Sequence, residues 1–160
     1  METLTQLATG LGGWPGAQWL RASWVAYLFV NAAHVLGIAL LVGPILILDL
    51  RLLGAWRRLP LDLLAPLLSH VAAFGLALTL LAGIWLFSVR PAEYVANPAF
   101  RWKLVLLMLA LANIALQHAN PAYRRALAAG TAAASVKLSA AASALLWLGV
   151  LVAGRWIGFA

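Results

Sequence analysis

Four long apolar runs, each nearly free of charged residues, constrain this chain more than any other feature of its sequence. They lie at about residues 24–49, 61–88, 102–119 and 137–157. A helix needs roughly 20 apolar residues to cross the hydrocarbon core of a bilayer, and these runs have about that length. Backbone polar groups in lipid must be paired within the chain, so the runs are expected to be helices. The sequence therefore predicts an all-α transmembrane domain over residues 24–160.

The composition agrees with a membrane protein. Of the 160 residues, 65% are hydrophobic and 9% are charged, whereas soluble domains have roughly 25% charged residues. The connecting segments 52–60, 89–101 and 120–136 are short. Short connections favour an up-down-up-down four-helix bundle in which neighbouring helices are antiparallel. We expect one domain, with lipid as the surroundings of its helices.

The first 23 residues are too polar and too rich in glycine to span a bilayer. Trp14 and Trp19 are typical of a segment that lies in the membrane interface, so residues 1–23 are interpreted as an interfacial N-terminal segment. The segment lacks the basic start of a secretory signal, because the first arginine is Arg21. The first span is therefore expected to act as an uncleaved insertion signal.

The net charge of +7 comes from 11 basic and 4 acidic residues. The basic residues flank the apolar runs, as anchoring and snorkelling side chains do, and this placement argues against nucleic-acid binding. Six basic residues fall on one predicted side and five on the other, which favours both termini outside. The chain has no cysteine, which excludes disulfides, thiolate metal sites and covalently attached haem.

Small residues four positions apart allow two membrane helices to approach closely. Ala33 and Gly37 have this spacing in the first span, and Ala73 and Ala77 have it in the second. We expect these positions to face neighbouring helices.

Three histidines lie in or at the end of the apolar runs: His34, His70 and His118. An ionisable residue within a membrane span is costly, so it is treated as a candidate functional residue. From their positions in the spans, His34 and His70 differ in depth by roughly 10 Å, and His70 and His118 by about 5 Å. Either pair could hold an iron between two imidazoles, and the second pair more easily.

Haem b is the cofactor that these residues best permit, because it needs no covalent attachment and histidine is among its axial ligands. His34 is the first candidate ligand, with His70 or His118 as the second. Cations near a membrane face would hold the propionates or an anionic substrate. Arg101, Lys103 and Arg155 supply cations on the same side as His34.

Two other interpretations use the same histidines. Imidazole also suits copper, so His34, His70 and His118 could belong to a metal transport or sensing protein. Alternatively, the chain is a cofactor-free membrane anchor whose histidines bond to polar residues across helices, with Asn31 and Asn113 as available partners. No Ser-His-Asp arrangement, P-loop or dinucleotide fingerprint indicates an enzyme class.

The acidic residues Asp49, Asp62 and Glu93 all flank the spans, so the sequence shows no buried carboxylate relay. Asp49 and Arg51 are two positions apart and cannot face each other on a helix. Each is expected to pair with another helix or loop.

Several patches occur in the order of one family. They are the stretch from His34 through Gly54, then Gly83 to Phe87, then Asn97 to Lys103, and finally Gly154 to Phe159. In these patches the chain resembles a family of small bacterial four-helix membrane proteins of unknown function. It has a fainter likeness to the small, haem-associated membrane protoporphyrinogen oxidase, and to the membrane domain of copper-resistance D proteins.

The resemblance implies a multi-pass protein of the bacterial inner membrane. Together, the residues and the resemblance predict a b-type haem protein that takes part in electron transfer or membrane redox chemistry. Its expected partners are the lipid bilayer and a quinone or a redox protein, and a homo-oligomer is compatible with the sequence.

Overall fold

The computed structural model describes residues 12–159, and over this range the chain is helical without any strand. Four helices are long and apolar enough to span a membrane: α3 (Trp24–Leu53), α4 (Leu61–Phe87), α6 (Pro98–Ala119) and α8 (Ala134–Trp156). The prediction of an all-α chain with four candidate spans is therefore confirmed. Residues 1–11 of the predicted interfacial segment lie outside the described residues.

The helix ends follow from capping residues. The Asn97 side chain accepts hydrogen bonds from the first backbone N–H groups of α6, so this helix begins at Pro98, before the predicted position. The first span also extends further than predicted, to Leu53. It ends at Gly54, whose φ of 117° is favourable only for glycine, and the N–H of Gly54 donates to the Leu50 carbonyl.

Three short helices occupy segments that the sequence predicts to be connections or an interfacial segment. They are α2 (Pro15–Ala22), α5 (Pro91–Ala96) and α7 (Pro121–Ala129). Each begins with a proline, whose missing N–H is not needed at the first helical position. Asn120 also caps α7, and Gly130 ends it with a φ of 70°.

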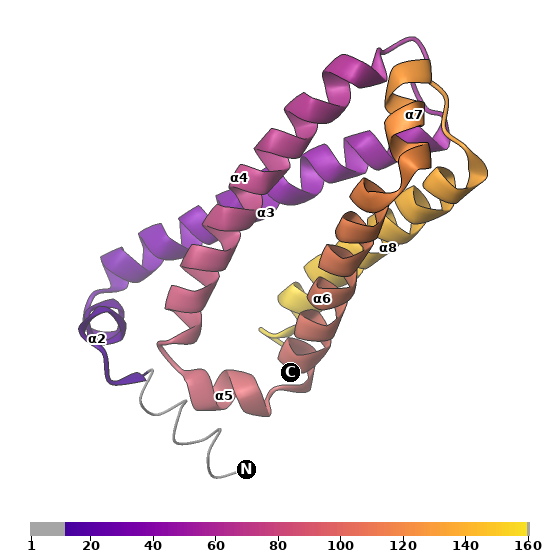
Figure 1. Ribbon diagram of the computed structural model, residues 1–160. Helices are drawn as coiled ribbons and strands as arrows, with labels where there is room; N and C mark the ends of the chain where they lie inside the picture. Colours follow the sequence, from indigo (N-terminus) through magenta and orange to yellow (C-terminus); the bar gives the residue numbers. More distant parts are fainter. Residues whose placement is uncertain (1–11, 160) are drawn as a thin grey trace.

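The long helices form two pairs. Helix α3 packs along α4, helix α8 packs along α6, and α3 and α8 join the pairs, whereas α4 and α6, both fully described, do not pack along each other. Figure 1 shows the pairs close together near α7 and further apart where α5 connects α4 to α6. The alternating up-and-down direction of the four spans stays a prediction.

Glycine sets the contact within the first pair. A Cβ built on Gly37 of α3 would lie 2.5 Å from the Thr79 hydroxyl oxygen and 2.7 Å from its backbone nitrogen. The expected contribution of Gly37 to helix packing is confirmed. The matching small residue on α4 is Gly75, which lies between the predicted Ala73 and Ala77.

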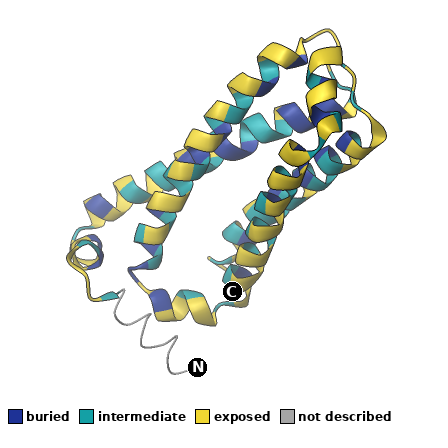
Figure 2. Ribbon diagram, viewed as in Figure 1, coloured by how far each residue is buried: buried dark blue, intermediate teal, exposed yellow. Residues whose placement is uncertain are grey.

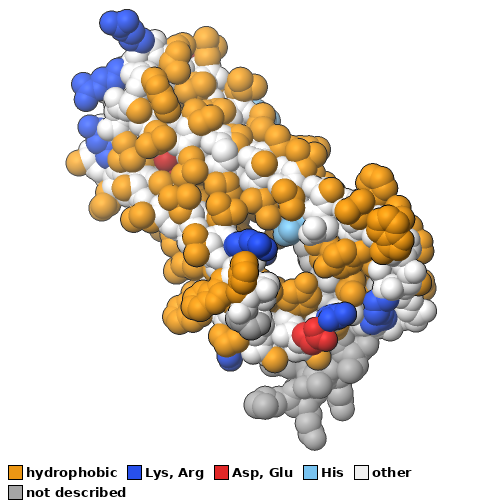
Figure 3. All heavy atoms as spheres, turned by 180° about the vertical axis from the view of Figure 1, so that it is seen from behind, with side chains coloured by type: hydrophobic (Ala, Val, Ile, Leu, Met, Phe, Trp, Pro, Cys, Tyr) orange, Lys and Arg blue, Asp and Glu red, His pale blue; other side chains and the backbone are white. Residues whose placement is uncertain are grey.

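Most of the long helices' surface faces outward. Even in α3, the most buried span, only 39% of the apolar window is buried within the protein. Exposed residues follow the outer faces of all four helices (Figure 2), and apolar side chains cover most of one face of the molecule, with Lys and Arg near both ends and one cation beside a histidine in the middle (Figure 3). Such a surface fits a lipid environment.

Five of the six exposed tryptophans among residues 12–159 lie at one end of the molecule, near the ends of the long helices: Trp14, Trp19, Trp24, Trp102 and Trp156. The sixth, Trp56, lies in the connection between α3 and α4, at the opposite end. Tryptophan is enriched where membrane and water meet, so the end that carries α2 and α5 has the composition expected of a membrane interface.

Candidate functional site

A cavity of about 370 Å³ lies between the two helix pairs, in the half of the molecule that carries α7. Its walls are mainly apolar and come from α3, α4 and α6, with Leu41, Ile45, Leu68 and Ile114 among them. His70 and His118 also line it, so we call it the histidine cleft. Its size falls within the roughly 300–1,000 Å³ of small-molecule sites.

The two imidazoles of the cleft are held in the same way. Nδ1 of His70 lies 2.7 Å from the Pro66 carbonyl oxygen, and Nδ1 of His118 lies 2.9 Å from the Ile114 carbonyl oxygen. A carbonyl can only accept, so Nδ1 carries the hydrogen in both rings. In the neutral form of each ring, Nε2 is then the nitrogen with the lone pair that can bind a metal. A hydrogen bond of this kind is also what orients histidine ligands at metal sites.

Tyr123 of α7 closes one end of the histidine cleft. Its ring packs against the His118 ring with a centroid distance of 5.3 Å, and the residue is 4% exposed. Burial, together with the nearby Asp49 carboxylate, raises the pKa of Tyr123. The hydroxyl therefore stays protonated at neutral pH.

His34 lies away from this cleft, in the contact between α3 and α4. Its Nδ1 is 2.9 Å from the Thr79 carbonyl oxygen, and a Cβ on Gly83 would lie 2.9 Å from its Cε1. The structure thus brings His70 and His118 together and separates His34 from both. Within residues 12–159, no group of three His, Cys, Asp or Glu side chains could hold a metal ion.

Asn113, one of the two polar residues proposed as partners of the histidines, bonds to another helix instead. Asn113 connects α6 to α8: its Nδ2 donates to the Ser139 carbonyl at 3.1 Å, and its Oδ1 accepts from the Ser139 hydroxyl at 3.0 Å. His34 bonds a backbone carbonyl on α4. These bonds are the cross-helix contacts expected for a membrane domain, although between different residues.

The basic residues expected to hold propionates do not line the histidine cleft. Lys103 runs along Gly154, about 3.6 Å from where a Cβ of that glycine would be. The Arg155 guanidinium lies 4.7 Å from the centre of the Phe159 ring, and Arg101 is exposed. All three belong to the tryptophan-marked end, on the first turns of α6 and the last turn of α8.

Asp49 and Arg51 are both buried, at 3% and 4% exposed, and have separate surroundings. The Arg51 guanidinium donates to three backbone carbonyls, those of Leu59 at 2.9 Å, Arg57 at 3.1 Å and Gly130 at 3.4 Å. Arg51 therefore joins the segment between α3 and α4 to the end of α7. The expectation that Arg51 pairs with a loop is confirmed.

Asp49 lines the histidine cleft, as does Ser143 of α8. Its Oδ2 and the Oε1 of Gln117, which also lines the cleft, have no hydrogen-bond partner among the described residues. Buried acceptors of this kind are rare and mark a site of interest. Sequence reasoning missed Gln117, although its amide next to His118 within an apolar run was a signal.

Comparison with known proteins gives one match. Residues 19–160 match the model of a family described as a family of unknown function, DUF6644. No curated protein and no solved structure matches the chain. The faint likenesses to the protoporphyrinogen oxidase and to copper-resistance D proteins are therefore not supported by any match.

Proposed function

This chain belongs to the DUF6644 family, whose function is not known, and from its geometry we propose that it is an integral membrane protein that binds haem b in the histidine cleft. His70 and His118 would hold the haem iron. The proposed role is electron transfer in the bacterial inner membrane, with a quinone or a redox protein as partner.

One observation carries this proposal: two imidazoles from different helices line the same apolar cavity, each with Nδ1 fixed to a backbone carbonyl. Two imidazoles that offer Nε2 are the ligand set of a bis-histidine haem. The bundle interior between facing helices is also a usual place for such a cofactor. His70 and His118 therefore replace His34 as the first candidate ligands.

The remaining residues of the cleft fit a porphyrin in most respects. Leucine and isoleucine side chains provide apolar walls, and the Tyr123 ring beside His118 provides an aromatic edge. The exposed Arg124 and Arg125 follow Tyr123 on α7 and are cations available to propionates. Asp49 is the one residue of the cleft whose charge would not favour an anionic group.

When bound, haem would supply one-electron chemistry. His70 and His118 would hold the group, and the apolar walls of the cleft would pack against its ring. Arg101, Lys103 and Arg155 lie elsewhere and would serve a lipid phosphate or an anionic substrate at the interface.

Purification of the full chain from cells grown with ample haem tests the proposal. A Soret band at about one haem per chain supports it. A colourless protein that also fails to take up added haem contradicts it. Metal analysis of the same sample separates the other two interpretations, because stoichiometric copper favours a metal transport or sensing protein, and neither copper nor haem favours a cofactor-free anchor.

A further inference from the structure

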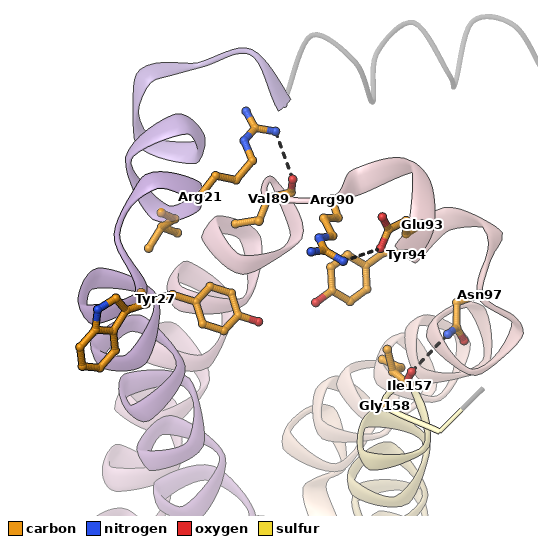
Figure 4. A pocket seen from close by; sticks show the side chains of 11 residues that line it. Arg21, Tyr27, Val89, Arg90, Glu93, Tyr94, Asn97, Ile157 and Gly158 are labelled. Atoms are coloured by element: carbon orange, nitrogen blue, oxygen red, sulfur yellow. Dashed lines mark hydrogen bonds and ion pairs between the residues drawn. The ribbon is translucent and has the colours of Figure 1, made fainter.

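A second and larger pocket, of about 900 Å³, lies at the opposite end of the molecule from α7. It is bounded by α2, the first turn of α3, the segment from the end of α4 through α5, and the end of α8 (Figure 4). Trp24 and Tyr27 contribute from one side, and Tyr94 and Asn97 from the other. We call it the tyrosine pocket.

The tyrosine pocket lies at the end that exposed tryptophans mark as a membrane interface. Trp24, which lines it, is 78% exposed and is directed to the surroundings of the protein. A ligand with an apolar tail and a polar ring could enter such a pocket from the bilayer while its ring stays at interface depth.

Two phenol hydroxyls face the interior of the pocket. Those of Tyr27 and Tyr94 point toward one another from separate helices, α3 and α5 (Figure 4). The Tyr94 ring is held in place by Phe87 and Phe100, with centroid distances of 5.9 and 5.5 Å, and those two rings stack on each other at 5.4 Å. The Tyr94 ring is therefore positioned before any ligand binds, which lowers the entropy lost on binding.

Tyr94 is also a donor that keeps its proton. Burial raises the pKa of Tyr94 above its usual value. The neighbouring Tyr27 hydroxyl raises it further, despite the opposing effect of Arg90. Tyr94 therefore offers a neutral O–H group at physiological pH.

The cations around the pocket are already engaged by the protein. The Arg21 guanidinium donates to the carbonyls of Val89, at 3.2 Å, and of Gly12. Arg90 pairs with the Glu93 carboxylate at 3.4 Å. The charged side chains of the lining therefore keep a net charge of +1, and the Tyr27 and Tyr94 hydroxyls add two neutral donors. The hydroxyls suit a neutral acceptor, and the remaining charge makes an anionic headgroup the competing ligand.

We infer that the tyrosine pocket binds the ring of a membrane quinone, with Tyr27 and Tyr94 as donors to one of its carbonyl oxygens. A quinone combines a carbonyl acceptor, a flat ring and an apolar tail, and each has a counterpart here. The biological role of quinone binding rests on the proposed redox function. The tyrosine pocket is a different cavity from the histidine cleft, so quinone binding can be measured without haem.

Decylubiquinone is the probe, added to the detergent-solubilised full chain with and without bound haem. Quenching of tryptophan fluorescence reports binding, since Trp24 lines the pocket. We expect saturable quenching in both preparations. Tyr27→Phe and Tyr94→Phe, which keep the ring and remove only the hydroxyl, should each weaken binding about five-fold. Thr131→Val, which removes an exposed hydroxyl outside both cavities, is the matched control and should change nothing.

Three results would overturn the inference. The first is quenching that never saturates, which is the behaviour of a quinone that only partitions into detergent. The second is equal affinity in both tyrosine variants, provided that their circular dichroism and melting temperatures match those of the parent chain. The third is loss of binding in Arg21→Gln and Arg90→Gln together with competition by phosphatidylglycerol vesicles. That result would assign the pocket to an anionic lipid headgroup. Saturable quinone binding by a protein that never takes up haem would contradict the haem proposal alone.

Discussion

Gly37 of α3 and Gly75 of α4 lie against each other where the two helices cross. A Cβ on Gly75 would be 2.9 Å from the Gly37 carbonyl oxygen, and a Cβ on Gly37 would be 3.1 Å from the Gly75 carbonyl oxygen. No side chain separates the two backbones at this point. The first helix pair, which positions both His34 and His70, therefore depends on these two glycines.

Alanine at either glycine should separate the pair. In Gly75→Ala the added methyl would also meet the Leu41 nitrogen at 2.5 Å, so the helices must move apart, at a cost of about 1–3 kcal/mol. Thermal unfolding in detergent should show a lower melting temperature for Gly37→Ala and Gly75→Ala. Gly43→Ala, also on α3 but with nothing within 4 Å of its Cβ, is the control and should not be destabilised. Equal melting temperatures in all three variants would contradict this packing.

Arg51→Ala should be strongly destabilising. The guanidinium donates to the carbonyls of Leu59, Arg57 and Gly130, and its loss leaves these acceptors without their donor, at a cost of about 3 kcal/mol. Arg58→Ala removes an exposed cation from the same connection and should stay within about 0.5 kcal/mol of the parent. Unfolding of both variants in the same detergent checks the difference, and similar losses in the two would rule out this role for Arg51.

Asp49→Asn should stabilise the protein when no ligand is bound. The buried carboxylate has one oxygen without a partner among the described residues, and an amide of similar size carries no charge to desolvate. We expect a gain of about 1 kcal/mol or more at pH 7. Asp62→Asn is the control, because Asp62 is exposed in the first turn of α4, where a negative charge is slightly favourable. A lower melting temperature for Asp49→Asn would mean that the carboxylate has a partner.

Gly83→Ala should disturb His34 and nothing in the histidine cleft. The new methyl would lie 2.9 Å from Cε1 of His34, so the ring must turn and weaken its bond to the Thr79 carbonyl. Stability should fall by about 1 kcal/mol, while the haem spectrum stays that of the parent chain. A changed spectrum in this variant would return His34 to the ligand set.

The sequence was enough to predict the four long helices because their signal is composition and length, which lipid makes decisive. It was not enough to pair the histidines. Depth along each span placed His70 near His118, but the direction of each ring depends on helix rotation and on which helices pack together. The bond from His34 to Thr79, and the burial of Arg51 among three loop carbonyls, are tertiary features with no local pattern.

Gln117 and Tyr123 illustrate the same limit. Both line the histidine cleft, yet Tyr123 lies in a segment that the sequence interpretation left as a connection. The asparagine and proline before it were read as the end of a span, and they also begin α7. The same two residues end one helix and begin the next, and only the structure shows that a second helix follows.

The absorption spectrum of three alanine variants tests the central claim most directly. With the full chain purified under ample haem, His70→Ala and His118→Ala should each lose the bis-histidine spectrum, by loss of haem or by conversion to a high-spin form. His34→Ala should keep the parent spectrum at comparable haem content, although with lower stability. Loss of haem in His34→Ala, with His70→Ala and His118→Ala unchanged, would contradict the account.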